Sequence, residues 1–445
     1  METILIKTAQ LLLSLSILVV LHEFGHFMFA RLFNTRVEKF YLFFNPWFSL
    51  VKIQKGDTEY GIGWLPLGGY VKISGMMDES MDKEAMKLPA QPYEFRSKPA
   101  WQRLLIMLGG VLMNFLFAML IYIGIMYAWG EEFLPTENAK YGISVNEVGK
   151  EIGFQNGDKI LSVDNKYIES FTAIIPTLVL DNAKTVQVER NGQKTDVEIS
   201  DSDIALLLKS RSVLTPRTPF EIKVGRVEKN SPAQNAGLQK EDIFVSVDSL
   251  KFEFYDEFTD YYSTKKGNII TVVIEREGQK LTKEITVSEE GKIGFYATYI
   301  NPDVFEYKTV KYGFFESFPA GIKRGVRTTS DYLKQFRLFF KKDTKAYESL
   351  GGFATIGNIF PGTWDWYSFW NMTAFISIIL AIMNLLPIPA LDGGHVMFLF
   401  GEIITGRKPG EKFLEYAQIA GMVLLLALVL FANANDIIKM INGTF

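Results

Sequence analysis

Long apolar stretches dominate the pattern of hydrophobic and polar positions along this 445-residue chain. Three stretches contain no Asp, Glu, Lys or Arg: 104–129, 366–391 and 416–435. A fourth, 8–30, is apolar apart from a polar cluster near its end. Each meets the ~20 residues that a helix needs to cross a ~30 Å hydrocarbon core. We therefore predict four transmembrane helices, within residues 1–30, 104–129, 366–401 and 416–435.

The N-terminal stretch has a second interpretation, as a cleaved signal peptide, because Lys7 precedes the apolar run Leu11–Leu21. However, no small-x-small cleavage site follows that run, and the apolar character continues to Ala30. We interpret the stretch as a retained transmembrane helix. Ionisable groups inside a span are costly, so its polar cluster indicates a functional site.

Basic residues are distributed unevenly among the loops. Eleven Lys and Arg lie in 31–103, three more lie between the last two spans, and each terminus carries one beside its span. Short loops rich in positive charge favour the cytoplasmic side of the membrane. Both basic loops are therefore predicted to be cytoplasmic, and residues 130–365 and the two termini to lie outside.

The outer segment contains a weak internal repeat. Residues 146–164 and 227–248 align as two copies, and each continues into an alternating strand and a turn. The order of strand, short helix, Gly turn and further strands resembles a PDZ domain in both copies. We therefore predict PDZ-like α+β domains at 138–210 and 215–300.

PDZ domains bind extended peptides by adding a strand to a sheet edge, and often hold a C-terminal carboxylate. The second copy carries Ser231-Pro-Ala and Ala236-Gly-Leu, which are typical of the family, whereas the first copy has a different sequence at 146–153. Neither copy has a Gly-Leu-Gly-Phe-like carboxylate loop. The alternative is that the pair serves as spacers or gates that bind no peptide tightly.

Two further segments have patterns of their own. Residues 48–73 alternate around a turn at Lys55–Asp57, which predicts a membrane-associated β-hairpin within the loop 31–103. Within 301–365, residues 314–340 set apolar side chains among many Lys and Arg. This is the pattern of an amphipathic helix on a membrane surface, although a packed helix of a soluble domain would show it too.

Composition limits the possible chemistry. The net charge is −3, with 47 Lys and Arg against 50 Asp and Glu, so the chain offers no general positive field for nucleic acid. It has no cysteine, which excludes disulfides, thiolate zinc sites, iron–sulfur clusters and thiol nucleophiles. Any metal must therefore bind to His, Asp or Glu. Only three histidines exist: His22, His26 and His395.

Two of these histidines lie in the motif His22-Glu23-Phe24-Gly25-His26 of the first predicted helix. At a spacing of i and i+4, both imidazoles rise from one helix face and can share a zinc ion, while Glu23 can act as base toward the attacking water. The alternative is a buried polar cluster that neighbouring helices satisfy. It must account for three ionisable groups in one membrane helix, so we favour zinc.

Catalytic zinc usually has three protein ligands and one open position. The segment 384–395 supplies a candidate, because Pro387 and Pro389 break the third span and Asp392 follows them. His395 follows Asp392 by three residues. It could be a fourth zinc ligand, a hydrogen-bond partner of a ligand, or a structural residue. We favour the last two roles, since four protein ligands would close the open position.

Depth in the membrane supports a common site for the two motifs. At ~1.5 Å per residue, His22 lies about 13 Å before the charge of Arg31, and Asp392 lies about 15 Å before Glu402. Both residues are thus predicted at a similar depth on the cytoplasmic side.

These motifs resemble the site-2 proteases, a family of intramembrane zinc metalloproteases. The shared features are His22-Glu-Phe-Gly-His26, Leu67-Gly-Gly-Tyr-Val-Lys72 within 61–75, Gly109-Gly-x-x-x-Asn114, the two PDZ-like domains and 384–394. The resemblance covers nearly the whole chain. It implies a polytopic α-helical membrane protein of the bacterial inner membrane, with two inserted PDZ-like α+β domains and a membrane-associated β-hairpin.

The resemblance also implies roles for individual residues. His22, His26 and Asp392 would bind Zn²⁺, and Glu23 would be the catalytic base. Substrate contacts would include Asn384, Gly68, Gly69 and Pro387, and the hairpin would pair with the substrate as an added strand. Substrates would be single-span membrane proteins, such as anti-sigma factors or signal-peptide remnants, screened for size by the PDZ pair. The oligomeric state is left open.

Two other functions are compatible with parts of the pattern. A scaffold without activity would keep the PDZ pair but would have little use for Glu23 between two histidines. A zinc transporter would need a continuous polar path through the spans, whereas the polar groups lie at one depth. We therefore predict a zinc-dependent intramembrane metalloendopeptidase, whose partners are the lipid bilayer and membrane proteins rather than nucleic acid.

Overall fold

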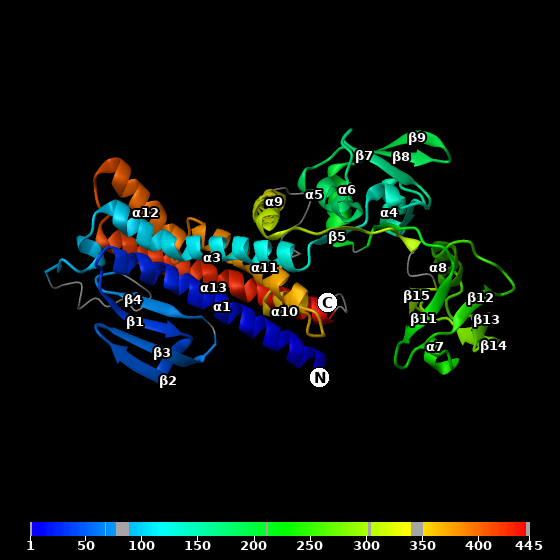
Figure 1. Cartoon of the computed structure of the whole chain (residues 1–445), viewed down its shortest axis with the longest axis horizontal. Coiled ribbons are helices and arrows are strands. Elements are labelled where there is room, and N and C mark those ends of the chain that lie inside the picture. The colour runs from blue at the N-terminus through cyan, green and yellow to red at the C-terminus, as the bar shows by residue number, and fades with distance from the viewer. Residues whose placement is uncertain are drawn as a thin grey trace. The chain divides into compact units, whose positions relative to one another are not determined.

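The computed structural model describes residues 2–66, 68–76, 89–210, 212–300, 304–339 and 350–441. The chain forms two compact units (Figure 1). The first, which we term the helical unit, comprises Met1–Gly130, Lys311–Leu333 and Leu350–Phe445. The second, the inserted unit, comprises Glu131–Val310 and Lys334–Ser349.

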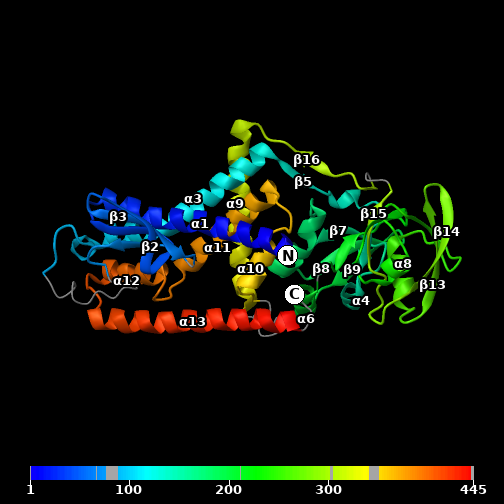
Figure 2. The same cartoon turned by 90° about the horizontal axis from the view of Figure 1, so that it is seen from below.

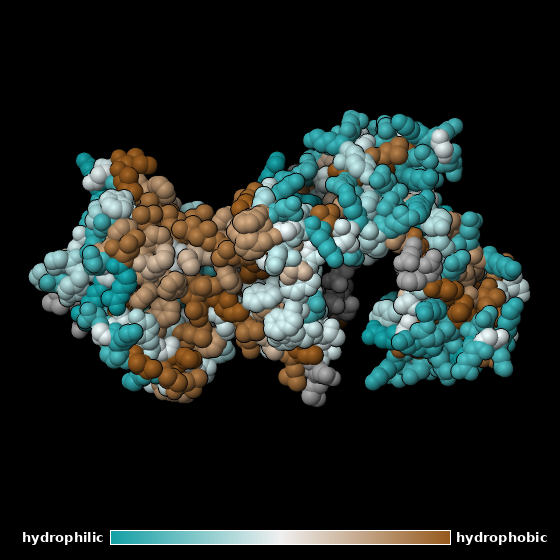
Figure 3. Space-filling view, in the orientation of Figure 1, coloured by the Kyte–Doolittle hydropathy of each residue, from teal (hydrophilic) through white to brown (hydrophobic). Residues whose placement is uncertain are grey.

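Four helices of the helical unit are long and apolar enough to cross a bilayer: α1 (Glu2–Leu32), α3 (Ala100–Ala128), α11 (Trp366–Leu385) and α13 (Glu411–Ile441). Their number agrees with the four spans predicted from hydropathy. Helix α3 packs against both α1 and α11, and apolar surface gathers over these helices (Figure 3). Helix α13 buries little of its surface and lies at the outside of the unit (Figure 2). The chain is therefore a polytopic membrane protein.

The third predicted span is interrupted. Helix α11 ends at Leu385, and α12 (Asp392–Thr405) begins after an irregular segment. Pro387 and Pro389 lack the backbone N–H that a helix needs, and proline also disfavours the helical conformation in the residue before it. Because α12 packs against α3, the interruption keeps Asp392 within the helical unit.

The predicted β-hairpin is half of a larger sheet. Strands β2 (Phe44–Lys55) and β3 (Thr58–Leu65) form the hairpin, and β1 (Val37–Leu42) and β4 (Tyr70–Ile73) extend it in the order β2-β3-β1-β4. Strand β1 runs parallel to β3 and antiparallel to β4, so β4 forms one edge of the sheet. Both β1 and β4 pack against α1. The expectation of a lone hairpin is therefore corrected to a four-stranded sheet.

Strand β2, at the opposite edge of this sheet, exposes a row of large apolar side chains: Trp47, Phe48, Leu50, Val51 and Ile53. Trp47 is the most exposed of them, at 91%. Exposed apolar surface of this kind marks a contact with a membrane or a partner. It supports the predicted membrane association of the hairpin.

Helix α9 (Phe314–Phe339) has two different faces between Phe314 and Leu333. One face packs on membrane helices, where Gly321 meets Ile123 of α3 and Arg324 donates a hydrogen bond to the Asn371 side chain of α11. The other face exposes apolar side chains: Phe314, Phe315, Phe318, Ile322, Val326 and Leu333. The first face thus packs on candidate membrane helices and not within a soluble domain, and the membrane-surface interpretation stays a prediction for the second face. A short helix, α10 (Phe353–Ile359), follows.

The inserted unit contains two small domains whose element orders match except for α6, an extra helix in the first domain. The first has β6 (Ile143–Val145), α4 (Glu147–Ile152), β7 (Lys159–Val163), α5 (Ile174–Leu180), β8 (Thr185–Arg190), β9 (Gln193–Glu198), α6 (Asp201–Lys209) and β10 (Leu214–Pro216). The second has β11 (Ile222–Val227), α7 (Pro232–Asn235), β12 (Ile243–Val247), α8 (Tyr255–Ser263), β13 (Ile269–Arg276), β14 (Gln279–Thr286) and β15 (Phe295–Tyr299). Each has its own apolar core. Strands β5 (Glu131–Phe133) and β16 (Lys308–Val310) pair with each other.

Equivalent ion pairs show that the internal repeat is structural. In the first domain Arg190 binds Asp158, and in the second Arg276 binds Asp242. Both aspartates are nearly fully buried, and each also accepts a hydrogen bond from the backbone N–H three residues before it. Both arginines also donate to the carbonyl of a turn glycine. The two domains therefore share one structural plan.

Candidate active site

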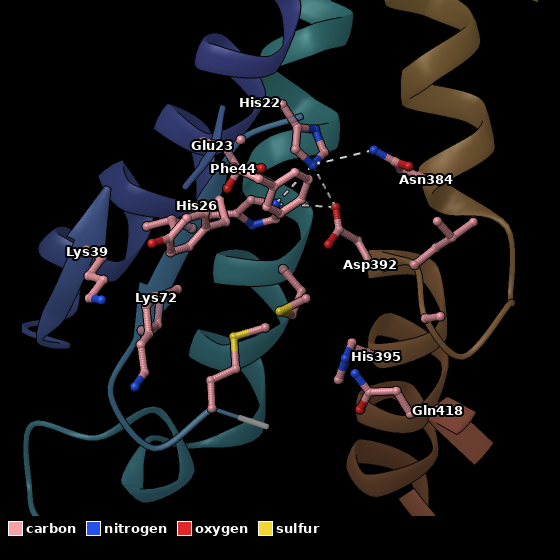
Figure 4. A pocket seen from close by; sticks show the side chains of 18 residues that line it. His22, Glu23, His26, Lys39, Phe44, Lys72, Asn384, Asp392, His395 and Gln418 are labelled. Carbon is pink, nitrogen blue, oxygen red and sulfur yellow. Dashed lines mark hydrogen bonds and ion pairs between the residues drawn. The ribbon is translucent and has the colours of Figure 1, made fainter. Parts of the chain in front are cut away.

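Three of the predicted site residues meet between helices α1 and α12 (Figure 4). The Nε2 atoms of His22 and His26 lie 3.2 Å apart, and they lie 3.1 Å and 3.3 Å, respectively, from Oδ2 of Asp392. The spacing of i and i+4 places both imidazoles on one face of α1, and Asp392 is the first residue of α12. We call the three atoms the donor group.

Neighbouring side chains and carbonyls orient the two imidazoles. Nδ1 of His26 lies 2.8 Å from the carbonyl oxygen of Ile106, so Nδ1 carries the proton that this oxygen accepts. The lone pair of His26 Nε2 then faces the rest of the donor group. Nδ1 of His22 lies 3.5 Å from the side-chain nitrogen of Asn114, whose Oδ1 is buried without a hydrogen bond. Turning this amide over lets Oδ1 accept the proton of His22 Nδ1.

Helix α3 contributes two residues that were not among the predicted site residues, Gly110 and Asn114. A Cβ atom on Gly110 would lie 2.5 Å from His26 Nε2 and 2.6 Å from His22 Cε1, so only glycine leaves room for both imidazoles. The two residues are four apart and share one face of the helix. That spacing, inside the motif Gly109-Gly-x-x-x-Asn114, is the signal in the sequence that could have identified them.

Replacing Gly110 with Ala is expected to weaken zinc binding by about 10–100-fold, the usual cost of disturbing the groups around metal ligands. The added methyl group displaces an imidazole. Gly124→Ala on the same helix is the matched control, because a Cβ atom there meets nothing within 4 Å. Zinc affinity is measured by competition with a chelator. Equal affinities in the two variants would contradict the steric argument.

The donor group fits a zinc ion. Ligand atoms of a tetrahedral site with bonds of about 2.0–2.1 Å are about 3.3 Å apart, and the donor atoms are separated by 3.1–3.3 Å. Oδ2 of Asp392 is buried and accepts no hydrogen bond from the described residues. Two nitrogen lone pairs and a carboxylate oxygen therefore face one point, an arrangement that is costly unless a cation is present.

Glu23 lies beside the donor group and contacts the sheet. Glu23 and Val71 of β4 line the same cavity. A Cβ atom on Gly69 would lie 2.8 Å from Cγ1 of Val19 and 3.5 Å from Cγ of Glu23, so a glycine lets this segment approach α1 closely. A carboxylate fixed in this position, one residue after His22, can accept and return a proton.

The donor group and Glu23 line one cavity of about 550 Å³, together with strand β4. Of the four residues predicted to contact substrate, Asn384 and Gly69 also line it. Nδ2 of Asn384 lies 3.4 Å from His22 Nε2. Gly68 and Pro387 are not among the described residues that line the cavity. The structure thus brings two of the four to the site.

Two further residues, His395 and Tyr70, line the cavity but contribute no atom to the donor group. His395 lies one turn after Asp392 on α12, and the metal-binding cluster of the described residues does not include it. Burial raises the pKa of Tyr70 to about 12, and its hydroxyl donates a hydrogen bond to the Asn45 side chain. Tyr70 therefore stays neutral at physiological pH.

Similarity to known proteins agrees with this geometry. Residues 10–428 match the model of peptidase family M50. The chain belongs to this family. It is 30% identical to the regulator of sigma-E protease of Escherichia coli, over 96% of its own length and 97% of that protein. It is 26% identical to the regulator of sigma E protease of Haemophilus influenzae, over 96% and 98%. A Neisseria meningitidis protein, whose name classes it provisionally as a zinc metalloprotease, is 28% identical over 96% and 97%.

Membership of family M50 confirms the resemblance to site-2 proteases that the motifs indicated. The chain is accordingly a zinc-dependent metalloendopeptidase. With its four candidate spans, this M50 peptidase is a multi-pass membrane enzyme.

Proposed function

We propose that this M50 peptidase hydrolyses peptide bonds within transmembrane segments of other membrane proteins, using zinc held by His22, His26 and Asp392. The observation that carries the proposal is the convergence of the donor group between α1 and α12. Helix α1 is a candidate span, and α12 continues the interrupted third span. A substrate must therefore enter the helical unit to reach the donor group.

Each residue of the site has a defined task in the proposed reaction. Bound zinc supplies Lewis acidity, which polarises the scissile carbonyl and makes the attacking water more acidic. Glu23 accepts a proton from that water and returns it to the leaving amine. Ile106 and Asn114 hold the imidazoles.

Strand β4 offers a way to hold the substrate in an extended conformation. The backbone groups of a helical segment are paired internally, so the segment must unwind before a carbonyl can be attacked. Strand β4 lines the cavity and forms an edge of its sheet, so an unwound segment can pair with it as an added strand. The sequence suggested the hairpin for this role. We assign it to β4, because β4 lines the cavity together with Glu23.

The two domains of the inserted unit are proposed to be PDZ domains that control access. Their element order and shared ion pairs support a common plan. The uneven loop charge supports a location outside the bacterial inner membrane for these domains, with the zinc site toward the cytoplasmic leaflet. Similarity to regulators of sigma-E protease supports single-span proteins such as anti-sigma factors as substrates.

Metal analysis tests the proposed ligands. The purified protein should contain one zinc per chain, and His22→Ala or Asp392→Ala should lose most of it, because two remaining protein ligands bind weakly. His395→Ala is the matched control and should retain zinc. Full occupancy in Asp392→Ala, together with loss in His395→Ala, would assign the third ligand to His395 instead.

Deleting residues Tyr141 to Ser288 tests the proposed role of the inserted domains. We expect the remaining protein to cleave a short transmembrane substrate and to accept, in addition, one with a bulky outer domain. The reason is that domains across ~30 Å of hydrocarbon cannot touch the metal and must act on access. Cleavage of both substrates is compared with and without the deletion.

The same comparison separates gating from recruitment. Lower cleavage of the short substrate after deletion would indicate recruitment of substrate by the domains. Continued rejection of the large substrate by a zinc-loaded deletion variant would contradict gating.

A further inference from the structure

Helix α9 crosses α3 and α11 near one end of these two spans, and it is seen nearly end-on in Figure 1 and lengthwise in Figure 2. Gly321 and Gly325 let it pack closely on α3, because added Cβ atoms would meet Ile123 and Met119. Its other face exposes apolar side chains. A helix that crosses spans in this way and leaves an apolar face uncovered is typical of the interfacial layer of a bilayer, which contains the lipid phosphates.

Aromatic side chains mark the same level of the spans. Trp129, directly after α3, packs edge-on against Tyr367 of α11, with ring centroids 5.9 Å apart. Trp and Tyr are enriched at the headgroup level of membranes. Tyr122 lies six residues before the end of α3, and Asn371 lies five residues after the start of α11. At ~1.5 Å per residue, both are roughly 8–9 Å from those ends, within reach of a headgroup for a long side chain.

The half-buried side chain of Arg324 on α9 lies between these residues. Its Cζ atom is 5.3 Å from the centre of the Tyr122 ring, and its Nη2 donates a hydrogen bond to Oδ1 of Asn371 over 2.8 Å. The hydroxyl of Tyr367 lies 3.4 Å from the same nitrogen. All three partners are neutral, and Nε and Nη1 have no acceptor within the described residues. Because a guanidinium presents five N–H donors in a planar fork that matches phosphate, the remaining donors suit an anionic oxygen ligand.

No acidic residue of the surrounding elements offsets the charge of Arg324. Stretches 104–129 of α3 and 366–391 of α11 contain neither Asp nor Glu. Asp365 before α11 and Glu316 of α9 each accept a hydrogen bond from a backbone N–H, and Asp331 of α9 lies 3.9 Å from Arg327. Within the described part of the chain, none of these three carboxylates forms an ion pair with Arg324. Its positive charge is therefore uncompensated.

We propose that Arg324 binds the phosphate of an anionic phospholipid at this end of α3 and α11. The next residue along the chain, Lys323, is exposed and adds a second cation that has no ion pair within the described residues. Phe318, Ile322 and Val326 of the same helix expose apolar surface beside these cations. A lipid satisfies both features, because its phosphate binds the guanidinium while its acyl chains cover the apolar face. A soluble anion would satisfy only the first.

Lipid binding to the full-length protein tests this site. The protein, in micelles of an uncharged detergent, is titrated with phosphatidylglycerol or with phosphatidylcholine, and bound lipid is counted by native mass spectrometry. The wild type should bind phosphatidylglycerol about fivefold more tightly, the effect of about one basic residue at an anionic membrane surface. Arg324→Gln should lower the affinity for phosphatidylglycerol about fivefold. Lipids that bind elsewhere contribute equally to both proteins and cancel in the comparison.

Two further variants separate the site from a general attraction to a basic helix. Arg327→Gln removes the next arginine of α9, which has an acidic partner, and should keep the wild-type affinity within about twofold. Arg324→Lys keeps the charge but loses the planar fork, so its affinity for phosphatidylglycerol should fall between those of the wild type and Arg324→Gln. Thermal unfolding before lipid is added shows whether each variant is folded. If Arg324→Gln does not fold, Arg324→Lys replaces it in the comparison.

Inorganic phosphate is the second probe, and it should compete only weakly with phosphatidylglycerol because it has no acyl chains. Competition as strong as that of the lipid would assign the site to a soluble anion and overturn the proposal. Equal affinity of the wild type for both lipids, or equal losses in Arg324→Gln and Arg327→Gln, would overturn it too, as would wild-type affinity in both Arg324 variants. None of these outcomes bears on the proposed protease, because the donor group contains no residue of α9.

Discussion

Glu23→Gln is expected to lower the rate of substrate cleavage by about 10²–10⁴-fold, the usual contribution of general acid–base catalysis. The amide has nearly the size of the carboxylate, so the side chain fits the same place in the cavity wall. It cannot take the proton of the attacking water. The three donor atoms are unchanged, and zinc content should therefore equal that of the wild type.

Cleavage of a model transmembrane substrate, zinc content and thermal unfolding are measured on the same preparations. Glu59→Gln provides a matched control in the neighbouring sheet, where Glu59 accepts a hydrogen bond from Tyr41 and does not line the cavity. It should stay within about twofold of wild-type activity. If Glu23→Gln retained activity within about tenfold with full zinc, another residue would have to act as the base.

The converging residues could be found from the sequence because each depends on a local pattern. His22 and His26 are one helical turn apart, so their common face follows from helix geometry. Asp392 follows two prolines that interrupt an apolar stretch, and such an interruption at membrane depth indicates a site. Counting residues placed Asp392 at the depth of His22, and the two side chains lie 3.1 Å apart, while their depth in the membrane stays a prediction.

Contacts between distant segments left no comparable signal. Alternation in 48–73 predicted a two-stranded hairpin, and β4 falls inside that range, but its pairing with β1 as a third and fourth strand was not predicted. The sheet edge beside Glu23 was therefore missed. Gly110 belongs to a uniformly apolar helix, where hydrophobic periodicity alone does not separate a glycine packed on two imidazoles from one that faces lipid, so that only the motif Gly109-Gly-x-x-x-Asn114 could have identified it.

The ion pair between Arg103 of α3 and Glu402 of α12 is another long-range contact, across 299 residues of sequence. Their side chains are only 9% and 11% exposed. Arg103 also donates to the carbonyl oxygen of Lys98. Asp392 is the first residue of α12, and Glu402 lies near the other end of the same helix. The ion pair therefore fixes α12, which carries a proposed zinc ligand, against α3.

Removing one member of this pair, as in Arg103→Met or Glu402→Leu, is expected to destabilise the helical unit by about 3–5 kcal/mol, because the other charge stays buried without a partner. Unfolding in lipid-containing micelles and zinc affinity are measured together. Lys184→Met, which breaks an exposed pair with Asp201 in the inserted unit, is the control and should change unfolding little.

The double variant Arg103→Met/Glu402→Leu separates the cost of an orphaned charge from the value of the pair itself. Two apolar side chains bury no charge, so the double variant should recover most of the stability that either single variant loses. Zinc affinity should follow the same order, since α12 regains its packing on α3 and Asp392 its position. Additive losses in the double variant would show that the charges attract each other more strongly than burial penalises them. Stability that recovers without zinc affinity would show that the ion pair, and not packing alone, sets the position of Asp392.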